Sequence, residues 1–339
     1  MTRIAINGLG RIGRTFLKLA LERDELELVA VNDLADPENL AYLLKYDSVY
    51  GASGLEVEAT KNSLRINGVE IPFTQERDPS KLPWKKHKVD VVLESTGVFA
   101  SYEKAQVHLK AGAKRVVISA PVKDAPPSGI VGATVLMGVN EEKLKTCDIS
   151  SNASCTTNAG SPLIAILDEK IGVERAVLNT IHGYTSTQSL VDGPSSKMRR
   201  GRAAAVNIIP SSTGAAVATA KAHPQLEGKF DGVALRVPVT AGSIVDVTFI
   251  TKKDVTVEEV NEVLVAAAHE DRWKEIFTVT NDPIVSTDIL GSPFASIADL
   301  EMTRVVDGNL VKVLAWYDNE VGYTNTLVQH VLKTAKHVS

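Results

Sequence analysis

The sequence predicts an α/β protein of two domains, in which a parallel sheet is followed by a mixed or antiparallel one. The length of 339 residues exceeds the usual size of a single domain. In the first third of the chain, short apolar runs alternate with helix-like segments, a pattern typical of parallel sheets. From about Val173 onward the β-rich runs become longer, which indicates a sheet of the second kind.

In the first domain, strands are expected at residues 3–7, 28–32, 89–93 and 114–118. Between them, a helix is expected at residues 15–23, where Phe16, Leu19 and Ala20 share one face, and another at 102–111, which ends at Gly112.

In the second half, a helix is expected from near Thr156 through Leu167. Strands are expected at residues 177–181, 232–239 and 244–250. A helix at residues 257–268 and an amphipathic C-terminal helix at 326–336 follow. The boundary between the two domains is expected near residues 151–155.

Composition excludes several classes of protein. The apolar share of 44% and the charged share of 23% are ordinary for a globular chain and argue against disorder. A net charge of -4 argues against a protein whose main role is to bind nucleic acid or an anionic membrane. Basic residues near the start leave no apolar block for a signal peptide, and the uncharged stretch between Arg202 and Lys221 is too polar to span a bilayer. Two cysteines cannot form a disulfide framework, so a cytoplasmic protein is expected.

Three glycines, Gly8, Gly10 and Gly13, lie between the first expected strand and the first helix. In this arrangement the first allows a tight turn, the second lets a pyrophosphate approach the backbone, and the third lets the helix pack on the strand. Asp33 follows 20 residues after Gly13, where a carboxylate suits two ribose hydroxyls and repels a 2′-phosphate. No Lys or Arg occurs at residues 34–44 to receive such a phosphate. The motif therefore predicts a Rossmann-type domain that binds NAD rather than NADP.

Cys155 is the candidate nucleophile. It lies among Ser and Thr residues at the expected start of a helix, whose dipole favours a thiolate. His182, 27 residues downstream at the end of an expected strand, is its candidate base. Cys147 lacks such surroundings and is interpreted as a core residue. No spacing of Cys, His, Asp and Glu resembles a metal site, so no metal is expected.

Two features predict anion binding. Residues 211–215 offer hydroxyls and backbone amides before an Ala-rich helical run. Arg236 interrupts an apolar run, where an unpaired buried guanidinium is costly, so either a bound anion or a salt bridge is expected there. The basic run 199–202 has no interleaved aromatic residue, and we interpret it as a contact to small anions or to another subunit rather than to nucleic acid.

These motifs together are specific, and the chain resembles the phosphorylating glyceraldehyde-3-phosphate dehydrogenase family essentially end to end. The matching segments occur in the family's order at residues 6–14, 46–51, 94–99, 154–158, 182–185, 212–216 and 316–320. The resemblance implies an NAD-binding domain at residues 1–153, a catalytic domain at 154–318 and a C-terminal helix at 319–339 that packs back on the first domain. It also implies a homotetramer.

The resemblance implies roles for individual residues. Cys155 matches the family's nucleophile, and His182 matches the base that activates it. The positions that match cofactor contacts are Gly8, Gly10, Arg11, Ile12, Gly13, Asp33, Arg77, Ser119 and Asn319. Among these, Asn319 matches the residue that holds the nicotinamide carboxamide. The positions that match contacts to inorganic phosphate or to the substrate phosphates are Ser154, Thr156, Thr185, Arg200, Thr213, Gly214 and Arg236.

The activity implied by the resemblance is NAD-dependent oxidation of D-glyceraldehyde 3-phosphate to 1,3-bisphosphoglycerate, in glycolysis or gluconeogenesis. Inorganic phosphate is the second substrate, and Cys155 carries a thiohemiacetal and then a thioester. Erythrose-4-phosphate dehydrogenase is the alternative enzyme, although Thr185 stands in a pattern from which that family usually departs. Semialdehyde dehydrogenases lack this cysteine context. A catalytically idle protein that binds a cofactor or RNA is a further alternative, and the presence of both Cys155 and His182 argues against it.

The chain departs from the family pattern at three places. Ala159 stands where many relatives have a second cysteine, so a local disulfide cannot form. Val321 replaces a common tryptophan close to Asn319. The segment 124–132 is longer than usual and is interpreted as a surface loop.

Overall fold

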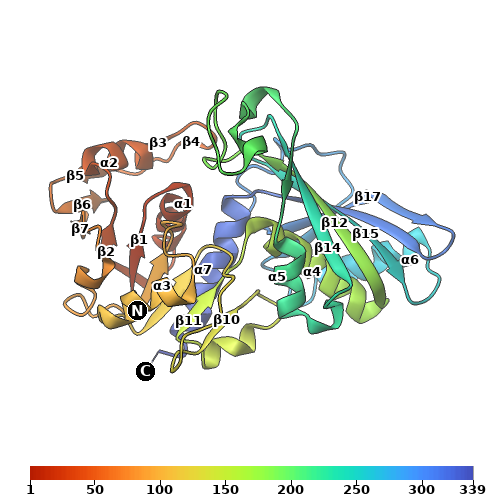
Figure 1. The fold of residues 1–339 in the computed structure, drawn as a ribbon, viewed down its shortest axis with the longest axis horizontal. Coiled ribbons are helices and arrows are strands. Elements are labelled where there is room, and N and C mark those ends of the chain that lie inside the picture. The colour runs from red at the N-terminus through yellow and green to blue at the C-terminus, as the bar shows by residue number, and fades with distance from the viewer. Residues whose placement is uncertain (339) are drawn as a thin grey trace. The chain divides into compact units, whose positions relative to one another are not determined.

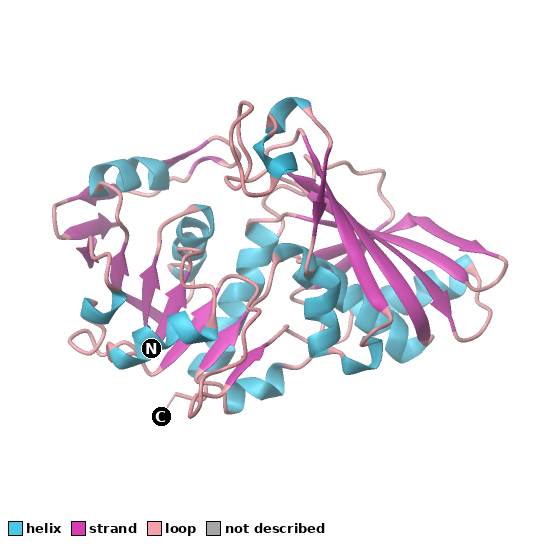
Figure 2. Cartoon of the chain, viewed as in Figure 1, coloured by secondary structure: helices cyan, strands magenta, loops and turns pink. Residues whose placement is uncertain are grey.

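The computed structural model describes residues 1–338, which divide into two compact units. Unit 1 contains Met1–Val135, Glu141–Ala153 and the chain from Thr324 onward, while unit 2 contains Leu136–Asn140 and Ser154–Tyr323. Figure 1 follows the chain by colour through both units, and Figure 2 separates helices from strands. No helix within residues 1–338 is both long and apolar enough to cross a membrane.

Unit 1 is built on a nine-stranded sheet in the order β10-β11-β9-β8-β1-β2-β7-β6-β5. Its strands are β1 (Thr2–Asn7), β2 (Leu26–Asn32), β5 (Val57–Ala59), β6 (Ser63–Ile66), β7 (Val69–Thr74), β8 (Val91–Glu94), β9 (Arg115–Ile118), β10 (Gly132–Thr134) and β11 (Ile149–Ser151). The strands from β10 to β7 in this order pair in parallel, as the alternation of apolar runs and helices predicts. The antiparallel ribbon of β5, β6 and β7 is not predicted, because its short strands mix polar and apolar residues.

The helices of unit 1 are α1 (Arg11–Ala20), α2 (Pro37–Lys45), α3 (Tyr102–Lys110) and the greater part of α7 (Val321–Ala335). A small hairpin, β3 (Tyr46–Asp47) and β4 (Gly51–Ala52), follows α2. Helix α1 begins at Arg11, four residues before the predicted start, because Gly10 is its N-cap and the helix opens directly from the glycine turn.

The long segment 124–132 is hydrogen-bonded to the start of helix α3 through Asp124. The carboxylate of Asp124 accepts the backbone N–H groups of Tyr102 and Glu103 at 3.1 and 3.0 Å. Ser101 caps the same helix through the N–H of Lys104. Asp124 therefore satisfies two of the amides that a helix start leaves without intrahelical partners.

Unit 2 is built on a seven-stranded sheet in the order β13-β14-β12-β15-β18-β17-β16. The strands are β12 (Val173–Gly183), β13 (Ile209–Ser212), β14 (Phe230–Val237), β15 (Ser243–Thr251), β16 (Phe277–Thr280), β17 (Ser296–Val306) and β18 (Leu310–Tyr317). Two of the neighbouring pairs are parallel and four are antiparallel, so the mixed sheet predicted for the second half of the chain is confirmed.

The helices of unit 2 are α4 (Cys155–Lys170), α5 (Ala215–Ala222) and α6 (Val257–Ala268). Short 3-10 turns occur at Pro79–Lys81 and Glu141–Lys145 of unit 1 and at Met198–Gly201, Ala204–Val206 and Pro224–Leu226 of unit 2. Helix α4 packs on β12, β15 and β18, and α5 packs on β14 (Figure 1). The strands alternate between buried and less buried residues, as β15 shows, so one face of the sheet forms the core against these helices.

Candidate active site

Cys155 is the first residue of α4 and follows a strained turn. Ala153 has a φ of 55°, in the left-handed region that residues with side chains avoid. The N–H of Ala153 donates to the Oγ of Ser151 at 3.1 Å. The next residue, Ser154, caps α4 by accepting the N–H of Thr157 at 3.1 Å. The thiol therefore lies at the positive end of a 16-residue helix, as the sequence predicts.

Four neighbouring strands each contribute one side chain to a row across the sheet. Arg236 on β14 lies opposite His182 on β12, His182 opposite Ser243 on β15, and Ser243 opposite Tyr317 on β18. Residues opposed in this way point to the same face of the sheet. His182, Ser243 and Tyr317 are at most 2% exposed. The sequence motifs predict roles for Arg236 and His182. Tyr317 lies in the matched segment 316–320 but has no predicted role, and Ser243 lies in no matched segment.

The thiol of Cys155 is in contact with the imidazole of His182. The distance from Sγ to Nε2 is 3.2 Å, and Nδ1 lies 2.6 Å from the carbonyl oxygen of Gly183. Burial, with the positive charge of Arg236, lowers the pKa of His182 to about 3, so the ring is neutral at neutral pH. In the tautomer that carries the proton on Nδ1 and donates it to Gly183, Nε2 presents a lone pair to the thiol, and Nη1 of Arg236 is a neighbouring charge rather than a hydrogen-bond donor to the ring.

The groups around Cys155 shift the pKa of its thiol in opposite directions. Burial raises the pKa of Cys155, while the charge of Arg236 and hydrogen bonds from Thr156 lower it. The hydroxyl of Thr156 also lies 3.0 Å from that of Tyr317, which lies 2.8 Å from the hydroxyl of Thr180. Because burial raises the pKa of Tyr317, its hydroxyl stays protonated and able to donate.

Two guanidinium groups give this region a positive potential. Arg236 donates from Nη1 to the carbonyl of Gly183 at 2.9 Å and lies 2.7 Å from Nδ1 of His182, while its buried Nε has no hydrogen-bond partner within residues 1–338. Arg200 donates to the hydroxyls of Ser211 and Thr187 at 3.0 and 3.3 Å. Burial and the charge of Arg236 lower the pKa of Arg200. Arg236 donates to the neutral carbonyl of Gly183 and forms no ion pair with a carboxylate among residues 1–338, which favours the anion over the salt bridge among the two explanations left open by the sequence.

The remaining predicted anion contacts lie at the ends of short elements. Thr185 Oγ1 is 2.9 Å from Thr187 Oγ1, the hydroxyl that Arg200 contacts. Gly214 is the N-cap of α5, and Thr213 accepts the N–H of Ala215 at 3.2 Å. Helices α4 and α5 pack on each other. The predicted contacts in unit 2 therefore gather around the starts of these helices and the loop that precedes β13.

Asn319 follows β18 and is 5% exposed. Its Oδ1 accepts a hydrogen bond from the N–H of Gly242 at 3.1 Å and another from the hydroxyl of Ser243 at 3.2 Å. The start of β15 therefore holds the oxygen end of this amide.

In unit 1, the glycine turn opens onto a pocket of about 370 Å³. Among the predicted cofactor contacts, those that line it are Gly8, Gly10, Asp33 and Arg77. A Cβ at Gly8, where φ is 100°, would meet the backbone of Thr96 at 2.8 Å, whereas nothing lies within 4 Å of one at Gly10. The turn is thus packed on one side and open on the other, as a phosphate cradle requires.

The other predicted cofactor contacts of unit 1 flank this pocket. Ile12 and Gly13 lie in the first turn of α1, and Ser119 directly follows β9. The side chain of Arg11 pairs with Asp47 at 3.0 Å and lies over the ring of Tyr50. Burial works against the Asp47 carboxylate, but the N–H of Val49 and the Arg11 guanidinium hold its pKa below the ordinary value. Arg11 therefore offers a ligand its backbone N–H rather than its charge.

Two family models match the chain. The NAD-binding domain of glyceraldehyde 3-phosphate dehydrogenase matches residues 2–102, and the C-terminal domain of the same enzyme matches residues 154–319. NAD is accordingly the cofactor of this chain, as the glycine motif and Asp33 predict.

Curated relatives match over almost the whole length. Glyceraldehyde-3-phosphate dehydrogenase of Thermotoga maritima is 51% identical over 331 residues, covering 97% of both chains. Glyceraldehyde-3-phosphate dehydrogenase 1 of Bacillus cereus is 48% identical over 330 residues, again covering 97% of both chains. The enzyme of Geobacillus stearothermophilus is 48% identical over 328 residues, covering 96% of both. The resemblance inferred from the motifs is confirmed, and the chain belongs to the glyceraldehyde 3-phosphate dehydrogenase family.

Proposed function

We propose that this chain oxidises D-glyceraldehyde 3-phosphate with NAD and inorganic phosphate, giving 1,3-bisphosphoglycerate, and that Cys155 and His182 perform the chemistry. The observation that carries the proposal is the 3.2 Å contact between the thiol and a neutral imidazole at the start of α4. A thiol becomes a strong nucleophile when a neighbouring base takes its proton. A protein that only binds a ligand would not need a base in contact with a thiol.

His182 acts first, as the general base. It takes the proton of Cys155 at Nε2, while its Nδ1–H keeps the ring oriented on the Gly183 carbonyl. The thiolate then adds to the substrate aldehyde, and the proton held by His182 passes to the new oxyanion to give a thiohemiacetal. His182 takes this proton back as the hydride leaves, and a thioester remains on Cys155. NAD, when bound, supplies the acceptor for the hydride.

The bound substrate assists the base electrostatically. A protonated His182 lies beside Arg236, and this repulsion is one reason why its pKa is lowered to about 3. A phosphate group bound to Arg236 and Arg200 would offset the two positive charges and raise the pKa of His182. Proton transfer to His182 is therefore easier when the anionic substrate is in place.

A second anion completes the reaction. Thr213 and Gly214 at the start of α5, with Ser154 and Thr156 at the start of α4, offer hydroxyls and amides of helix N-termini. Inorganic phosphate held there attacks the thioester and releases an acyl phosphate, which restores the thiol. Two separate anion sites are what a phosphorylating oxidation requires.

In unit 1, the pocket residues would hold the adenosine and pyrophosphate of NAD. Asp33 accepts the N–H groups of Leu9 and Ala35 at 2.6 and 2.8 Å, which fixes its carboxylate at the pocket wall. A fixed carboxylate accepts hydrogen bonds from ribose hydroxyls and repels a 2′-phosphate. This arrangement supports NAD as the preferred form of the cofactor.

The test is the initial rate of NADH formation from glyceraldehyde 3-phosphate and NAD, with and without inorganic phosphate. Parallel assays replace the triose with erythrose 4-phosphate, and NAD with NADP. A fast rate that depends on phosphate, the triose and NAD supports the proposal. Turnover of the tetrose alone would move the assignment to erythrose-4-phosphate dehydrogenase, and no turnover of either would favour a binding protein.

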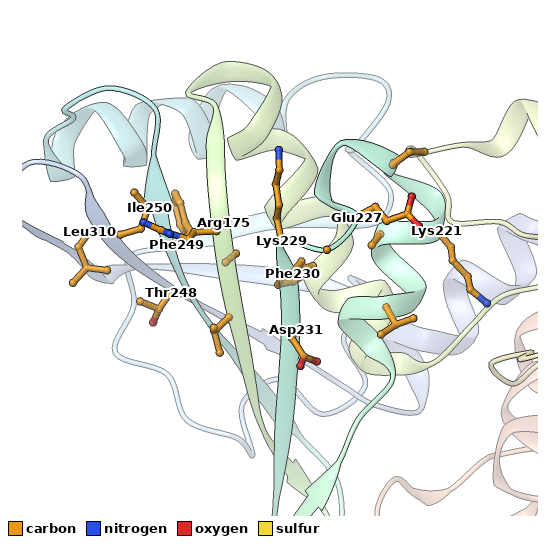
Figure 3. Close-up of a pocket in the computed structure, with 16 residues that line it drawn as sticks. Arg175, Lys221, Glu227, Lys229, Phe230, Asp231, Thr248, Phe249, Ile250 and Leu310 are labelled. Carbon is orange, nitrogen blue, oxygen red and sulfur yellow. The ribbon is translucent and has the colours of Figure 1, made fainter.

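We also propose that the chain forms a homotetramer in the cytoplasm. The face of the unit 2 sheet opposite α4 exposes Val177 by 58%, Val233 by 54% and Leu310 by 39%, so apolar side chains of three strands are exposed on the same face. A cavity of about 900 Å³ lies between β12, β14, β15 and α5. Figure 3 shows Phe230 and Leu310 beside it, together with charged side chains that include Lys229 and Asp231. A second copy of the chain would cover the exposed apolar side chains of this face. Light scattering coupled to gel filtration tests this, and a monomer mass would contradict it.

A further inference from the structure

One side chain in the row across the unit 2 sheet has no role in the chemistry above, namely the hydroxyl of Ser243. It is 2% exposed and lies between His182 and Tyr317. Its Oγ is 3.3 Å from the backbone nitrogen of Gly183, the residue after His182, and 3.2 Å from Oδ1 of Asn319. A single hydroxyl thus joins the strand that carries the base to the amide of Asn319.

The direction of each hydrogen bond follows from the groups involved. A backbone N–H can only donate, so the Ser243 oxygen accepts from Gly183. The single proton of the hydroxyl is then available for Oδ1 of Asn319, which also accepts the N–H of Gly242. Because the N–H of Gly242 and the hydroxyl of Ser243 both donate to the same atom of the Asn319 amide, that atom is the oxygen. The NH₂ group of Asn319 is then the part of the amide that can donate to a ligand.

We propose that Ser243 is a positioning residue for the cofactor, which keeps the NH₂ end of the Asn319 amide available to the carboxamide oxygen of NAD. This inference rests on the proposed function, in which Asn319 holds that carboxamide. Without the hydroxyl, only Gly242 holds the amide oxygen, and the side chain of Asn319 gains freedom to rotate. NAD binding then has to order the amide, which weakens it.

The experiment compares the binding of NAD with that of ADP-ribose, which lacks the nicotinamide ring, by titration calorimetry on the purified full chain. Loss of one buried hydrogen bond changes an affinity by roughly 2- to 10-fold. In Ser243→Ala the dissociation constant for NAD is expected to rise about fivefold, while that for ADP-ribose stays within about 1.5-fold of the wild type. A purely structural defect would weaken both ligands alike.

Ser296→Ala is the matched control. Ser296 is also buried in a strand of unit 2, with 0% exposure, and its hydroxyl has no partner. This variant is expected to bind both ligands as the wild type does. Ser243→Thr, which keeps the hydroxyl, is expected to restore NAD affinity to within about twofold. Ser243→Cys keeps nearly the volume of serine with a weak donor, and it serves in place of alanine should that variant not fold.

Two results would overturn the inference: equal weakening of NAD and ADP-ribose in both Ser243→Ala and Ser243→Cys, or unchanged NAD binding in both. The wild-type assay separates this from the proposed function. If the wild type forms NADH only with phosphate and the triose, yet the Ser243 variants bind NAD normally, Ser243 has no positioning role and the reaction stands. If the wild type forms no NADH but the variants lose NAD affinity selectively, the positioning stands and the reaction is wrong.

Discussion

The two units build their ligand sites in opposite ways. In unit 1 two of the charged side chains near the glycine turn already have partners: Arg11 binds Asp47, and Asp33 accepts two backbone N–H groups. The groups that face a ligand there are backbone at the start of α1 and along the glycines, together with the side chains of Asp33 and Arg77 at the pocket wall. In unit 2 the guanidinium groups of Arg200 and Arg236 bind only neutral groups, and the buried Nε of Arg236 has no partner.

This difference suits two kinds of ligand. Backbone amides recognise a pyrophosphate without changing the charge of the site, so NAD can bind and leave with little electrostatic cost. Unpaired cations instead make the site depend on the anion that fills it, and they also lower the pKa of His182. On the proposed function, the pKa of His182 therefore responds to substrate binding, whereas the ion pair of Arg11 with Asp47 leaves the start of α1 with less unpaired charge.

The largest expected effect is that of Cys155→Ser. A serine hydroxyl beside a neutral imidazole is a far weaker nucleophile than a thiol, so the rate of NADH formation should fall at least about a thousandfold. NAD binding, measured by calorimetry, should stay within about threefold of the wild type, because the pocket of unit 1 is untouched. Activity near that of the wild type would mean that another group is the nucleophile.

The two units also differ in how much of each site can be predicted from the sequence. Gly8, Gly10, Gly13 and Asp33 are found from spacing because their roles depend on one continuous strand, turn and helix. Cys155 is found for the same reason, since its position at the start of a helix is local. The row of Arg236, His182, Ser243 and Tyr317 spans four strands, and its alignment depends on register.

Register is set by the hydrophobic pattern of each strand and by turn geometry, so no local motif shows which residues oppose one another on strands that are far apart in the chain. Ser243 lies in no matched segment and Tyr317 has no predicted role, although the alternation along β15 does place Ser243 on the core face. The pairing of Arg11 with Asp47 is hidden for a similar reason, because the two residues come from different elements. Sequence gives the identity of an arginine, but only the fold shows whether its charge is still available.

Arg200→Leu and Arg11→Leu test that distinction directly. If Arg200 binds the substrate phosphate as proposed, removing its charge takes away a charged hydrogen bond, and KM for glyceraldehyde 3-phosphate should rise roughly 30-fold. The guanidinium of Arg11 already forms an ion pair with Asp47, so Arg11→Leu should change KM for NAD by less than about threefold. Steady-state kinetics on the two variants give both numbers. A large rise in KM for NAD in Arg11→Leu would contradict the view that unit 1 recognises its ligand through backbone.

Asp33→Ala probes the one side chain of unit 1 that is proposed to choose between cofactors. Loss of the carboxylate removes its repulsion of a 2′-phosphate and its hydrogen bonds to ribose. The ratio of kcat/KM for NAD to that for NADP should fall about tenfold. An unchanged ratio would show that selectivity lies elsewhere. Glu38→Ala, at an exposed acid on the first turn of α2, is the control for a general loss of negative charge.

The smallest expected effect concerns two buried histidines, one in each unit. His330 of unit 1 lies 2.7 Å from Ser150 Oγ and 3.1 Å from Asn152 Oδ1, and burial lowers its pKa to about 3, as it does for His182. Between pH 3 and the ordinary pKa of about 6.5, the unfolded chain binds a proton at each of these positions that the folded chain does not. Stability is therefore complete above pH 6.5 and is lost as the pH falls below it, by about 1 kcal/mol per pH unit for each histidine.

His330→Gln separates the two contributions, because it removes the titrating group of unit 1 and leaves that of unit 2. Urea unfolding at pH 7.5 and pH 5.5 should show a loss of stability about 1 kcal/mol smaller in the variant than in the wild type. NADH formation at pH 7.5 should stay within about twofold of the wild type, since His330 binds neutral groups of unit 1 only. An equal acid loss in both proteins would mean that His330 keeps its proton in the folded chain. The buried imidazole of unit 1 would then differ from that of unit 2 in charge as well as in role.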